Sequence, residues 1–201
     1  MFANKKNLIP HTPVITKIER EKLNKHKAFC IWFTGLSGSG KTTLAKGLEH
    51  ELYKLNIHSF LLDGDVVRTG LNKDLGFSDK DRTENIRRIG EISKLFSDAG
   101  MVVITAFISP FKKDRTSARR LFKNNTFIEI YVKCSLEDCE ERDPKKLYKN
   151  ALAGKIKNFT GISSVYEPPV NPEIILENGN GTDINKNIDT ILKYLYTKKV
   201  F

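Results

Sequence analysis

The sequence predicts an α/β fold with a five-stranded parallel sheet, and three observations support this prediction. Short apolar segments alternate along the chain with segments whose apolar residues recur at helical spacing. One segment, residues 101–108, is a long apolar run, as expected of a strand that is buried on both faces of a parallel sheet. A glycine-rich segment joins the first predicted strand directly to a helix. Because each predicted strand is separated from the next by a helical segment, parallel strands with right-handed crossovers are the simplest topology.

The amino-terminal region shows little pattern. Residues 1–15 have no clear period, and residues 16–25 show a weak helical pattern. We therefore expect residues 1–27 to form a leader that packs on a single domain spanning residues 28–201.

The first strands of the domain end in polar segments. Residues 29–34 read as a buried strand, and four leucines at helical spacing predict a helix over residues 41–55. A second short strand, residues 58–62, ends in Asp63-Gly64-Asp65. Because open α/β sheets bind ligands at the carboxyl ends of their strands, these two carboxylates should face the glycine-rich segment.

The rest of the chain continues the alternation. Residues 83–99 place their apolar residues on one helical face, which Asp79 or Asp81 can cap and Gly100 ends. The other elements follow in chain order: a short helix over 66–71, a loop over 72–78, the strand 101–108 that ends in Ser109-Pro110, a basic helix over 112–123, a fourth strand over 127–132, charged helices over 137–142 and 144–153, a fifth strand over 174–176 and a closing helix over 184–195.

One region is predicted to be a lid. Residues 154–172 contain aromatic residues, glycines and three prolines but little period, and they follow the short charged helices. We expect the lid to span about residues 140–162.

The composition narrows the function. A chain of 201 residues with 39% hydrophobic residues suits one ordinary core. The formal charge of +10 suits either nucleic acid or small polyanionic molecules, and because the lysines are scattered the charge alone does not decide between them. We expect no nucleic-acid partner. We find no segment apolar enough to cross a bilayer and no signal peptide, and we expect a cytoplasmic protein with no membrane partner. Cys30, Cys134 and Cys139 lack C-x-x-C spacing, which disfavours zinc or a disulfide framework.

The glycine-rich segment has the chemistry of a phosphate-binding loop. Residues 35–42 match G-x-x-x-x-G-K-[ST] in full, between a predicted strand and a predicted helix. The glycines let successive backbone N–H groups point at phosphate oxygens, and the following helix adds the positive end of its dipole. Lys41 should reach the β and γ phosphates, and the Thr42 hydroxyl is placed to bind Mg²⁺.

Other motifs decide between classes of phosphate-loop protein. A GTP switch needs N-K-x-D and D-x-x-G, which do not occur, and Gly38-Ser39-Gly40 lacks the third glycine of a dinucleotide fingerprint. Three classes of phosphate-loop protein remain as candidates: a small-molecule kinase, an ATPase motor and a nucleotide-sensing module. The size of the chain argues against a motor, and the basic segment at 140–160 suits a kinase lid.

Seven blocks of residues, in order and at compatible spacings, resemble the adenylylsulfate kinase family. They are Gly35-Leu36-Ser37-Gly38-Ser39-Gly40-Lys41-Thr42-Thr43, Asp63-Gly64-Asp65 with Arg68 and Gly70-Leu71-Asn72, Leu75-Gly76-Phe77-Ser78, Arg82 to Asn85, Phe107-Ile108-Ser109-Pro110, Arg142-Asp143-Pro144-Lys145, and Ile156-Lys157-Asn158-Phe159-Thr160-Gly161-Ile162. The resemblance implies a three-layer P-loop NTPase-like fold and transfer of the ATP γ-phosphoryl group to the 3′-hydroxyl of adenosine 5′-phosphosulfate (APS), which gives PAPS in sulfate assimilation. It also implies Mg²⁺ and a homodimer, and leaves room for association with ATP sulfurylase.

The same resemblance implies roles for individual residues. ATP would be bound by Gly35, Leu36, Ser37, Gly38, Ser39, Gly40, Lys41, Thr42, Thr43 and Arg142. APS would be bound by Asp65, Arg68, Phe77, Arg82, Asn85, Ile108, Ser109, Lys145, Asn158 and Phe159, with Phe77 and Phe159 sandwiching its adenine. Asp63 would be either the base for the 3′-hydroxyl or the holder of a Mg²⁺-bound water. Without the motifs, the arginines would read as solvated helix faces and both phenylalanines as core.

Two mechanisms are open for Ser109, where the family has sometimes been assigned a phosphoserine intermediate. Either Ser109 takes the phosphoryl group and passes it on, or the acceptor hydroxyl attacks directly while Ser109 and Ile108 position the acceptor. We prefer direct transfer, because a relay adds a step to a reaction whose two nucleotides are bound together anyway. Two other functions also remain: a different small-molecule kinase on this fold, and a non-catalytic ATP-binding module.

Overall fold

The structure, a computed structural model, describes residues 13–123 and 125–199. Most of the predicted unpatterned segment, residues 1–12, lies outside the described residues. Within them, no helix has the length and apolarity to cross a membrane.

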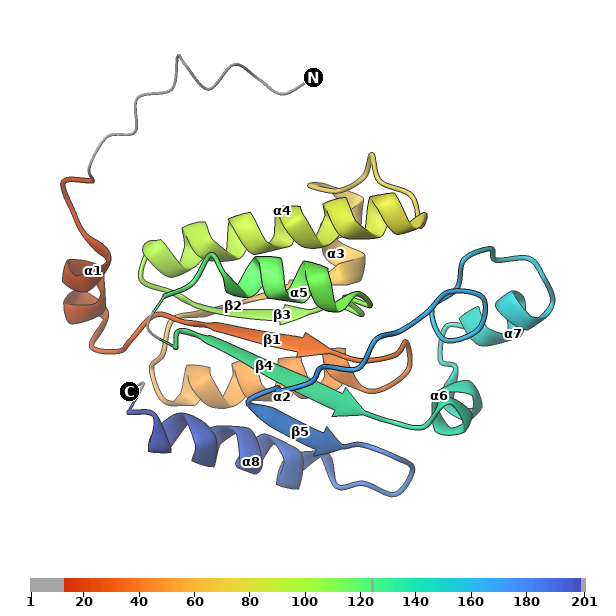
Figure 1. The fold of residues 1–201 in the computed structure, drawn as a ribbon. Helices are drawn as coiled ribbons and strands as arrows, with labels where there is room; N and C mark the ends of the chain where they lie inside the picture. The colour runs from red at the N-terminus through yellow and green to blue at the C-terminus, as the bar shows by residue number, and fades with distance from the viewer. Residues whose placement is uncertain (1–12, 124, 200–201) are drawn as a thin grey trace, which may run out of the picture.

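The strands form one parallel sheet in the order β2-β3-β1-β4-β5 (Figure 1). The predicted α/β class and the five-stranded parallel sheet are confirmed. All residues of β1 and β3 are buried, which explains why their sequences are apolar runs rather than alternating patterns. The strands are β1 Cys30–Thr34, β2 Ser59–Asp63, β3 Val102–Ala106, β4 Phe127–Lys133 and β5 Ile174–Glu177.

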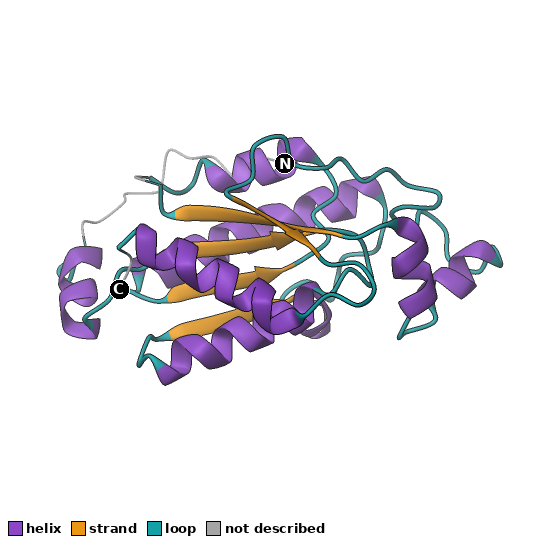
Figure 2. Ribbon diagram, turned by 90° about the horizontal axis from the view of Figure 1, so that it is seen from below, coloured by secondary structure: helices purple, strands orange, loops and turns teal. Residues whose placement is uncertain are grey.

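Helices cover both faces of the sheet and make the third layer. In Figure 1, α4 and α5 lie over one face and α2 and α8 over the other, and Figure 2 views the sheet from the α2 and α8 side. The helices are α1 Lys17–Asn24, α2 Lys41–Lys54, α3 Gly64–Thr69, α4 Asp79–Asp98, α5 Lys112–Arg119, α6 Leu136–Arg142, α7 Leu147–Leu152 and α8 Ile184–Thr197.

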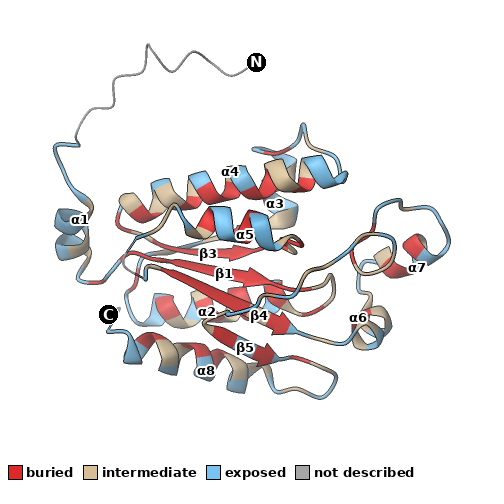
Figure 3. Cartoon of the chain, in the orientation of Figure 1, coloured by how far each residue is buried: buried red, intermediate tan, exposed pale blue. Residues whose placement is uncertain are grey.

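Two apolar clusters form the core, one on each side of the sheet (Figure 3). Leu44, Leu48 and Leu52 of α2 pack in one cluster against β1, β3, β4 and α8. Ile86 and Ile89 of α4 pack in the other, which includes Trp32 of β1. The sheet is thus fixed from both faces, and its carboxyl edge offers a rigid base for loops.

The predicted cap of α4 is wrong. The N-cap is Ser78, whose hydroxyl accepts from the backbone N–H of Asp81, and the helix begins at Asp79. Asp79 and Asp81 lie in its first turn, where their negative charges interact favourably with the positive end of the helix dipole. The predicted helix start at residue 83 is therefore four residues late.

Other boundaries also differ from the predictions. The helix predicted over 144–153 begins at Leu147, because the Asp143 carboxylate accepts from the backbone N–H groups of Leu147 and Lys149. Strand β3 ends at Ala106 rather than at residue 108, because the chain turns out of the sheet at Ser109, whose φ is +40°. Helix α3 begins earlier than predicted, since Asp63 acts as its N-cap.

Helix α1 is tied to the domain by polar contacts. Lys17 Nζ donates to the carbonyl oxygen of Ala28 at 2.7 Å and to Ser97 Oγ at 3.0 Å, and Asn24 Nδ2 donates to the carbonyl oxygen of Gly100 at 2.8 Å. None of the residues of α1 is buried. The division into a leader and a domain at residue 27 stays a prediction.

Candidate active site

The glycine-rich loop joins β1 to α2 at the carboxyl edge of the sheet. Neighbouring residues leave no room for a side chain at Gly38 or at Gly40. A Cβ on Gly40, whose φ is +94°, would lie 2.3 Å from Asn178 Nδ2, and a Cβ on Gly38, whose φ is +74°, would lie 2.9 Å from the carbonyl oxygen of Cys139. Asn178 and Cys139 therefore pack directly against the loop backbone, and glycine is required at both positions.

Lys41 begins α2 and folds back over the loop. Its Nζ donates to the carbonyl oxygens of Gly35 at 3.0 Å and Leu36 at 2.6 Å, and to Ser39 Oγ at 3.4 Å. Burial lowers the pKa of Lys41 from 10.5 to about 8, because a charged ammonium is poorly solvated there. The lysine thus brings a positive charge to the centre of the loop.

Thr42 and Asp63 meet beside the loop. Thr42 Oγ1 donates to Asp63 Oδ2 at 2.8 Å, and Asp63 Oδ1 accepts from the backbone N–H of Asp65 at 3.0 Å. Asp63 therefore faces the phosphate loop, as the sequence predicted. Asp65 points instead at the charged segment beyond β4 and forms an ion pair with Lys145.

The donors beside the loop fit Mg²⁺. A hydroxyl and a carboxylate oxygen are hard ligands, and protein-bound Mg²⁺ typically keeps several waters and takes the rest of its ligands from phosphates. Among the described residues, no group of three or more histidine, cysteine or acidic side chains could hold a metal.

A second group of predicted residues lies around the start of α4. The Arg68 guanidinium lies 4.4 Å from the centre of the Phe77 ring, which is exposed. Arg82 is buried and donates from Nε to the carbonyl oxygen of Phe77 at 3.1 Å and from Nη2 to that of Asn158 at 2.8 Å. The two segments predicted to hold the acceptor are thus joined by one arginine.

Asn85 and Phe159 are both buried. Asn85 Oδ1 accepts from Asn72 Nδ2 at 2.9 Å. The Phe159 ring packs edge-on against Tyr148, with centroids 4.9 Å apart, in a small cluster that includes Cys139 and Ala151. Phe159 therefore contributes to a local core in this structure, whereas Phe77 is exposed.

The loop after β3 turns inward at Ser109. This serine is buried, and its Oγ accepts from Trp32 Nε1 at 3.2 Å and donates to the carbonyl oxygen of Phe107 at 3.4 Å. Ile108 is half-buried, and its carbonyl oxygen accepts from Thr34 Oγ1 at 2.7 Å. The serine hydroxyl is thus directed into the protein.

The predicted lid contacts the phosphate loop and the residues around it. It lies beyond the carboxyl ends of the strands, where Figure 1 places α6 and α7. Tyr148 Oη donates to the carbonyl oxygen of Ser37 at 2.9 Å, and Arg142 Nε donates to Asn180 Oδ1 at 2.9 Å. With the pair of Lys145 and Asp65, these contacts place the segment over both groups of site residues.

A model of the adenylylsulphate kinase family matches residues 27–177 of the chain. The chain belongs to this family. The adenylyl-sulfate kinase of Oceanobacillus iheyensis is 54% identical over 193 residues, which are 96% of each chain. That of Staphylococcus haemolyticus is 52% identical over 199 residues, which are 99% of this chain and 100% of the relative.

Solved structures agree with this assignment. The APS kinase CysC of Mycobacterium tuberculosis, solved in complex with AMPPNP and APS, is 41% identical, with a TM-score of 0.81 over 85% of this chain and 99% of that chain. The likeness covers both the fold and the sequence. The predicted family and P-loop NTPase-like fold are thereby confirmed, and the chain is an ATP-dependent kinase of this family.

Sequence reasoning missed several residues of the kinase site. Asn178 is buried and donates from Nδ2 to the carbonyl oxygen of Ser39 at 2.7 Å, and Tyr166 Oη lies 3.0 Å from Thr34 Oγ1. Asn72 and Tyr148 were also overlooked as supports of Asn85 and of the phosphate loop. Two of these residues left a signal: Asn178 is a polar residue directly after a strand, and Asn72 stands in one of the resembling blocks, where it was given no role.

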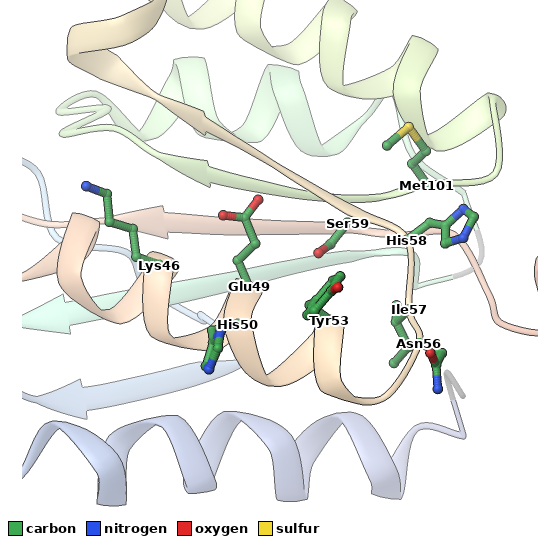
Figure 4. Close-up of a pocket in the computed structure, with 9 residues that line it drawn as sticks. All are labelled: Lys46, Glu49, His50, Tyr53, Asn56, Ile57, His58, Ser59 and Met101. Carbon is green, nitrogen blue, oxygen red and sulfur yellow. The ribbon is translucent and has the colours of Figure 1, made fainter.

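A separate depression lies on the other side of α2 (Figure 4). It has a volume of about 690 Å³ and contains none of the predicted site residues. Its walls come from the outer face of α2, the start of β2 and the residue before β3: Lys46, Glu49, His50, Tyr53, Asn56, Ile57, His58, Ser59 and Met101. This depression therefore lies apart from the predicted site residues at the carboxyl edge of the sheet.

Proposed function

We propose that the chain transfers the γ-phosphoryl group of ATP to the 3′-hydroxyl of APS and releases PAPS and ADP. The observation that carries this proposal is the hydrogen bond from Thr42 of the phosphate loop to Asp63, which lies at the end of β2 toward the proposed acceptor side. The relative from M. tuberculosis was solved with AMPPNP and APS together, which supports the same pair of substrates here. The sequence alternatives of another acceptor or a non-catalytic module are disfavoured by family membership over most of the chain.

Phosphoryl transfer needs an aligned nucleophile and neutralised charge on the γ-phosphoryl oxygens. The backbone N–H groups of residues 35–43 would bind the phosphates of ATP. The Lys41 ammonium, which binds loop carbonyls in the free protein, would exchange these for phosphate oxygens. Arg142 beside Asn180 would cover the nucleotide from the lid. Lys41 and Arg142 would thus neutralise phosphate charge in a site from which the lid excludes water.

Mg²⁺, when bound, would supply further positive charge to the phosphates. The Thr42 hydroxyl would hold it directly, and Asp63 would hold it through a water. Asp63 also suits the role of base, because it lies at the end of β2 beside the third strand, whose following loop bears Ile108 and Ser109. Both roles need the carboxylate to face the loop, as it does in this structure.

The acceptor site would be formed by the residues around Arg82. Arg68 and Arg82 carry guanidinium groups, which suit the anionic phosphosulfate, and Phe77 offers an exposed face for adenine. Lys145 and Asp65 neutralise each other in the free protein and would re-partner with the acceptor. Asn85, Asn158 and Phe159 complete this site from α4 and the lid.

Direct transfer is the mechanism that the geometry favours. A nucleophilic Ser109 would need an exposed hydroxyl and an activating base, whereas its hydroxyl is buried and occupied by Trp32 and the carbonyl of Phe107. Ser109 instead shapes the loop that carries Ile108, and the acceptor hydroxyl would attack the γ-phosphoryl group itself.

A coupled assay for ADP release tests this function. ADP should form rapidly only when ATP, Mg²⁺ and APS are all present. Lys41→Ala should lower kcat by roughly a hundredfold or more, because losing one preorganised charge has this effect. The matched control is Lys46→Ala, an exposed lysine further along α2, which should keep normal turnover. ADP release that does not depend on APS would contradict the proposal.

The assembly stays a prediction. We propose a homodimer on the family resemblance, while a relative from Thiobacillus denitrificans, described as a hexameric APS kinase, is 28% identical and is spanned by this chain over 32% of its length. An association with ATP sulfurylase is likewise a proposal. Sedimentation of the protein alone and with a sulfurylase would test both.

A further inference from the structure

Arg115 of α5 is a buried arginine to which none of the predicted site roles applies. Only 2% of its surface is exposed. All three of its guanidinium nitrogens donate: Nε to Glu129 Oε1 at 2.8 Å, Nη1 to the carbonyl oxygen of Ser109 at 2.6 Å, and Nη2 to that of Glu167 at 2.6 Å. One side chain therefore joins α5, β4 and two loop segments.

The two carbonyls belong to the segments that border the acceptor side. Ser109 lies in the loop after β3, and Glu167 lies where the chain returns from the lid toward β5 (Figure 1). Glu167 binds the first segment as well, because its backbone N–H donates to the carbonyl oxygen of Pro110 at 2.9 Å and its Oε2 accepts from the backbone N–H of Lys112 at 2.7 Å. Arg115 is thus the centre of a clamp between the acceptor loop and the lid exit.

The lid exit also contacts the end of β1, next to the phosphate loop. Tyr166, next to Glu167, shares a hydrogen bond with Thr34, whose hydroxyl lies 2.7 Å from the carbonyl oxygen of Ile108. Thr34 is the last residue of β1 and directly precedes the phosphate loop. Tyr166 therefore links the lid exit to the end of β1, whereas Arg115 itself hydrogen-bonds to Glu129 and to the two clamped segments.

Backbone strain at Ser109 indicates what the clamp does. A φ of +40° is unfavourable for a residue with a side chain and persists only where the surroundings impose it. The Arg115 bond to the Ser109 carbonyl and the Trp32 bond to its hydroxyl impose it here. Buried ion pairs such as Arg115 with Glu129 rarely add net stability over apolar residues of similar volume, so a role in geometry accounts better for this one.

We propose that Arg115 is a positioning residue for the acceptor. It holds the 107–110 loop in its strained turn and fastens the lid exit to it, so that Ile108 and the lid meet the acceptor in one fixed arrangement. The inference rests on the proposed function, because it assigns these segments to the APS side of the site. It predicts a defect specific to APS, since no hydrogen bond of Arg115 reaches the phosphate loop itself.

The test uses Arg115→Met, which keeps the length of the side chain but removes all its donors. Glu129 remains paired with Arg119 Nη2 at 3.1 Å in this variant, and the double variant Arg115→Met/Glu129→Gln removes the buried carboxylate charge as well. The control is Arg119→Met, one turn further along α5. Arg119 also contacts Glu129 but donates to Glu173 and to the carbonyl of Phe127, and not to either clamped segment.

Both Arg115 variants should raise KM for APS by roughly tenfold or more, the scale expected when bound groups are misplaced, while KM for ATP stays within about twofold. Arg119→Met should leave KM for APS within about twofold. Arg115→Lys, which keeps the charge and can reach one acceptor, should lie between wild type and Arg115→Met. Equal changes in both KM values, or an APS defect in Arg119→Met as large as in Arg115→Met, would overturn the proposal.

Hydrogen exchange gives a readout that does not depend on turnover. The backbone amides of Lys112 and Glu167 should exchange faster in both Arg115 variants and at the wild-type rate in Arg119→Met. Unchanged exchange in the Arg115 variants would refute the clamp even if the kinase function holds. Conversely, a wild-type protein that does not phosphorylate APS but shows this exchange pattern would refute the proposed function and leave the clamp in place.

Discussion

Raising the pH above 8 should reduce the efficiency with which the protein uses ATP, because it removes the proton from Lys41. Burial holds the pKa of this lysine at about 8, and the nearby carboxylates of Asp63 and Asp65 offset the burial only in part. The neutral amine would lack the charge that the phosphates require. The charged form of Lys41, which is the productive one, is therefore lost as the pH rises through 8.

The size of the effect follows from the titration curve. Lys41 should be about 90% protonated at pH 7 and about 10% at pH 9, so kcat/KM for ATP should fall about tenfold over this range. Bound phosphates favour the charged form, so kcat at saturating ATP should fall only at higher pH. The thiol of Cys139 and the phenols of Tyr148 and Tyr166 should titrate above this range, because burial raises the pKa of Cys139 to about 12 and also raises those of the two tyrosines.

The assay is the coupled ADP measurement at saturating APS and constant ionic strength, from pH 7 to 9.5. Lys41→Arg serves as the comparison, because a guanidinium stays charged throughout this range. Whatever turnover this variant retains should show no decline near pH 8. A wild-type profile that is flat up to pH 9.5, or the same decline in Lys41→Arg, would refute the reasoning.

Three further substitutions test other assignments. Ser109→Ala should retain substantial turnover, with a chirally labelled γ-phosphoryl group inverted once, because the serine hydroxyl is buried; a competent phosphoenzyme that is lost in the variant would reverse this assignment. Phe77→Ala should weaken APS binding by about 1 to 3 kcal/mol in calorimetry, the scale of one base stack, and leave ATP binding intact; equal losses would indicate damage to the fold instead. Gly40→Ala should strongly weaken ATP binding, because a side chain is strained at a φ of +94° and the new Cβ would lie 2.3 Å from Asn178 Nδ2. A Cβ at Gly70 would meet none of the described residues within 4 Å, so Gly70→Ala should bind ATP normally; similar ATP affinities for the two variants would show that the loop is not held as described.

The sequence predicted the fold because its local signals were strong. Apolar runs such as β3, buried at every position, and the helical spacing of leucines in α2 both follow from the layers that they build. The phosphate loop and Asp63 were placed correctly because a motif and the end of a strand fix both locally. The weaker local signals failed, as at the start of α4, which Ser78 caps in place of the predicted Asp79 or Asp81.

The supporting residues could not be predicted because their partners lie far away in the chain. Asn178 and Ser39 are 139 positions apart, and Tyr166 and Thr34 are 132 apart. Spacing within a segment carries no information about such pairs. The positive φ of Ser109 was equally hidden, since a serine before a proline gives no sign of a left-handed turn and the turn depends on Arg115 and Trp32.

Transfer of label from [γ-³²P]ATP tests the central claim most directly. The wild-type protein is incubated with labelled ATP, Mg²⁺ and APS, and the product is separated and treated with a 3′-nucleotidase. We predict that the label appears in a nucleotide that carries both the phosphosulfate and a 3′-phosphate, and that the nucleotidase releases it as inorganic phosphate. Label that remains in ATP, or that appears only as inorganic phosphate before this treatment, would contradict the account.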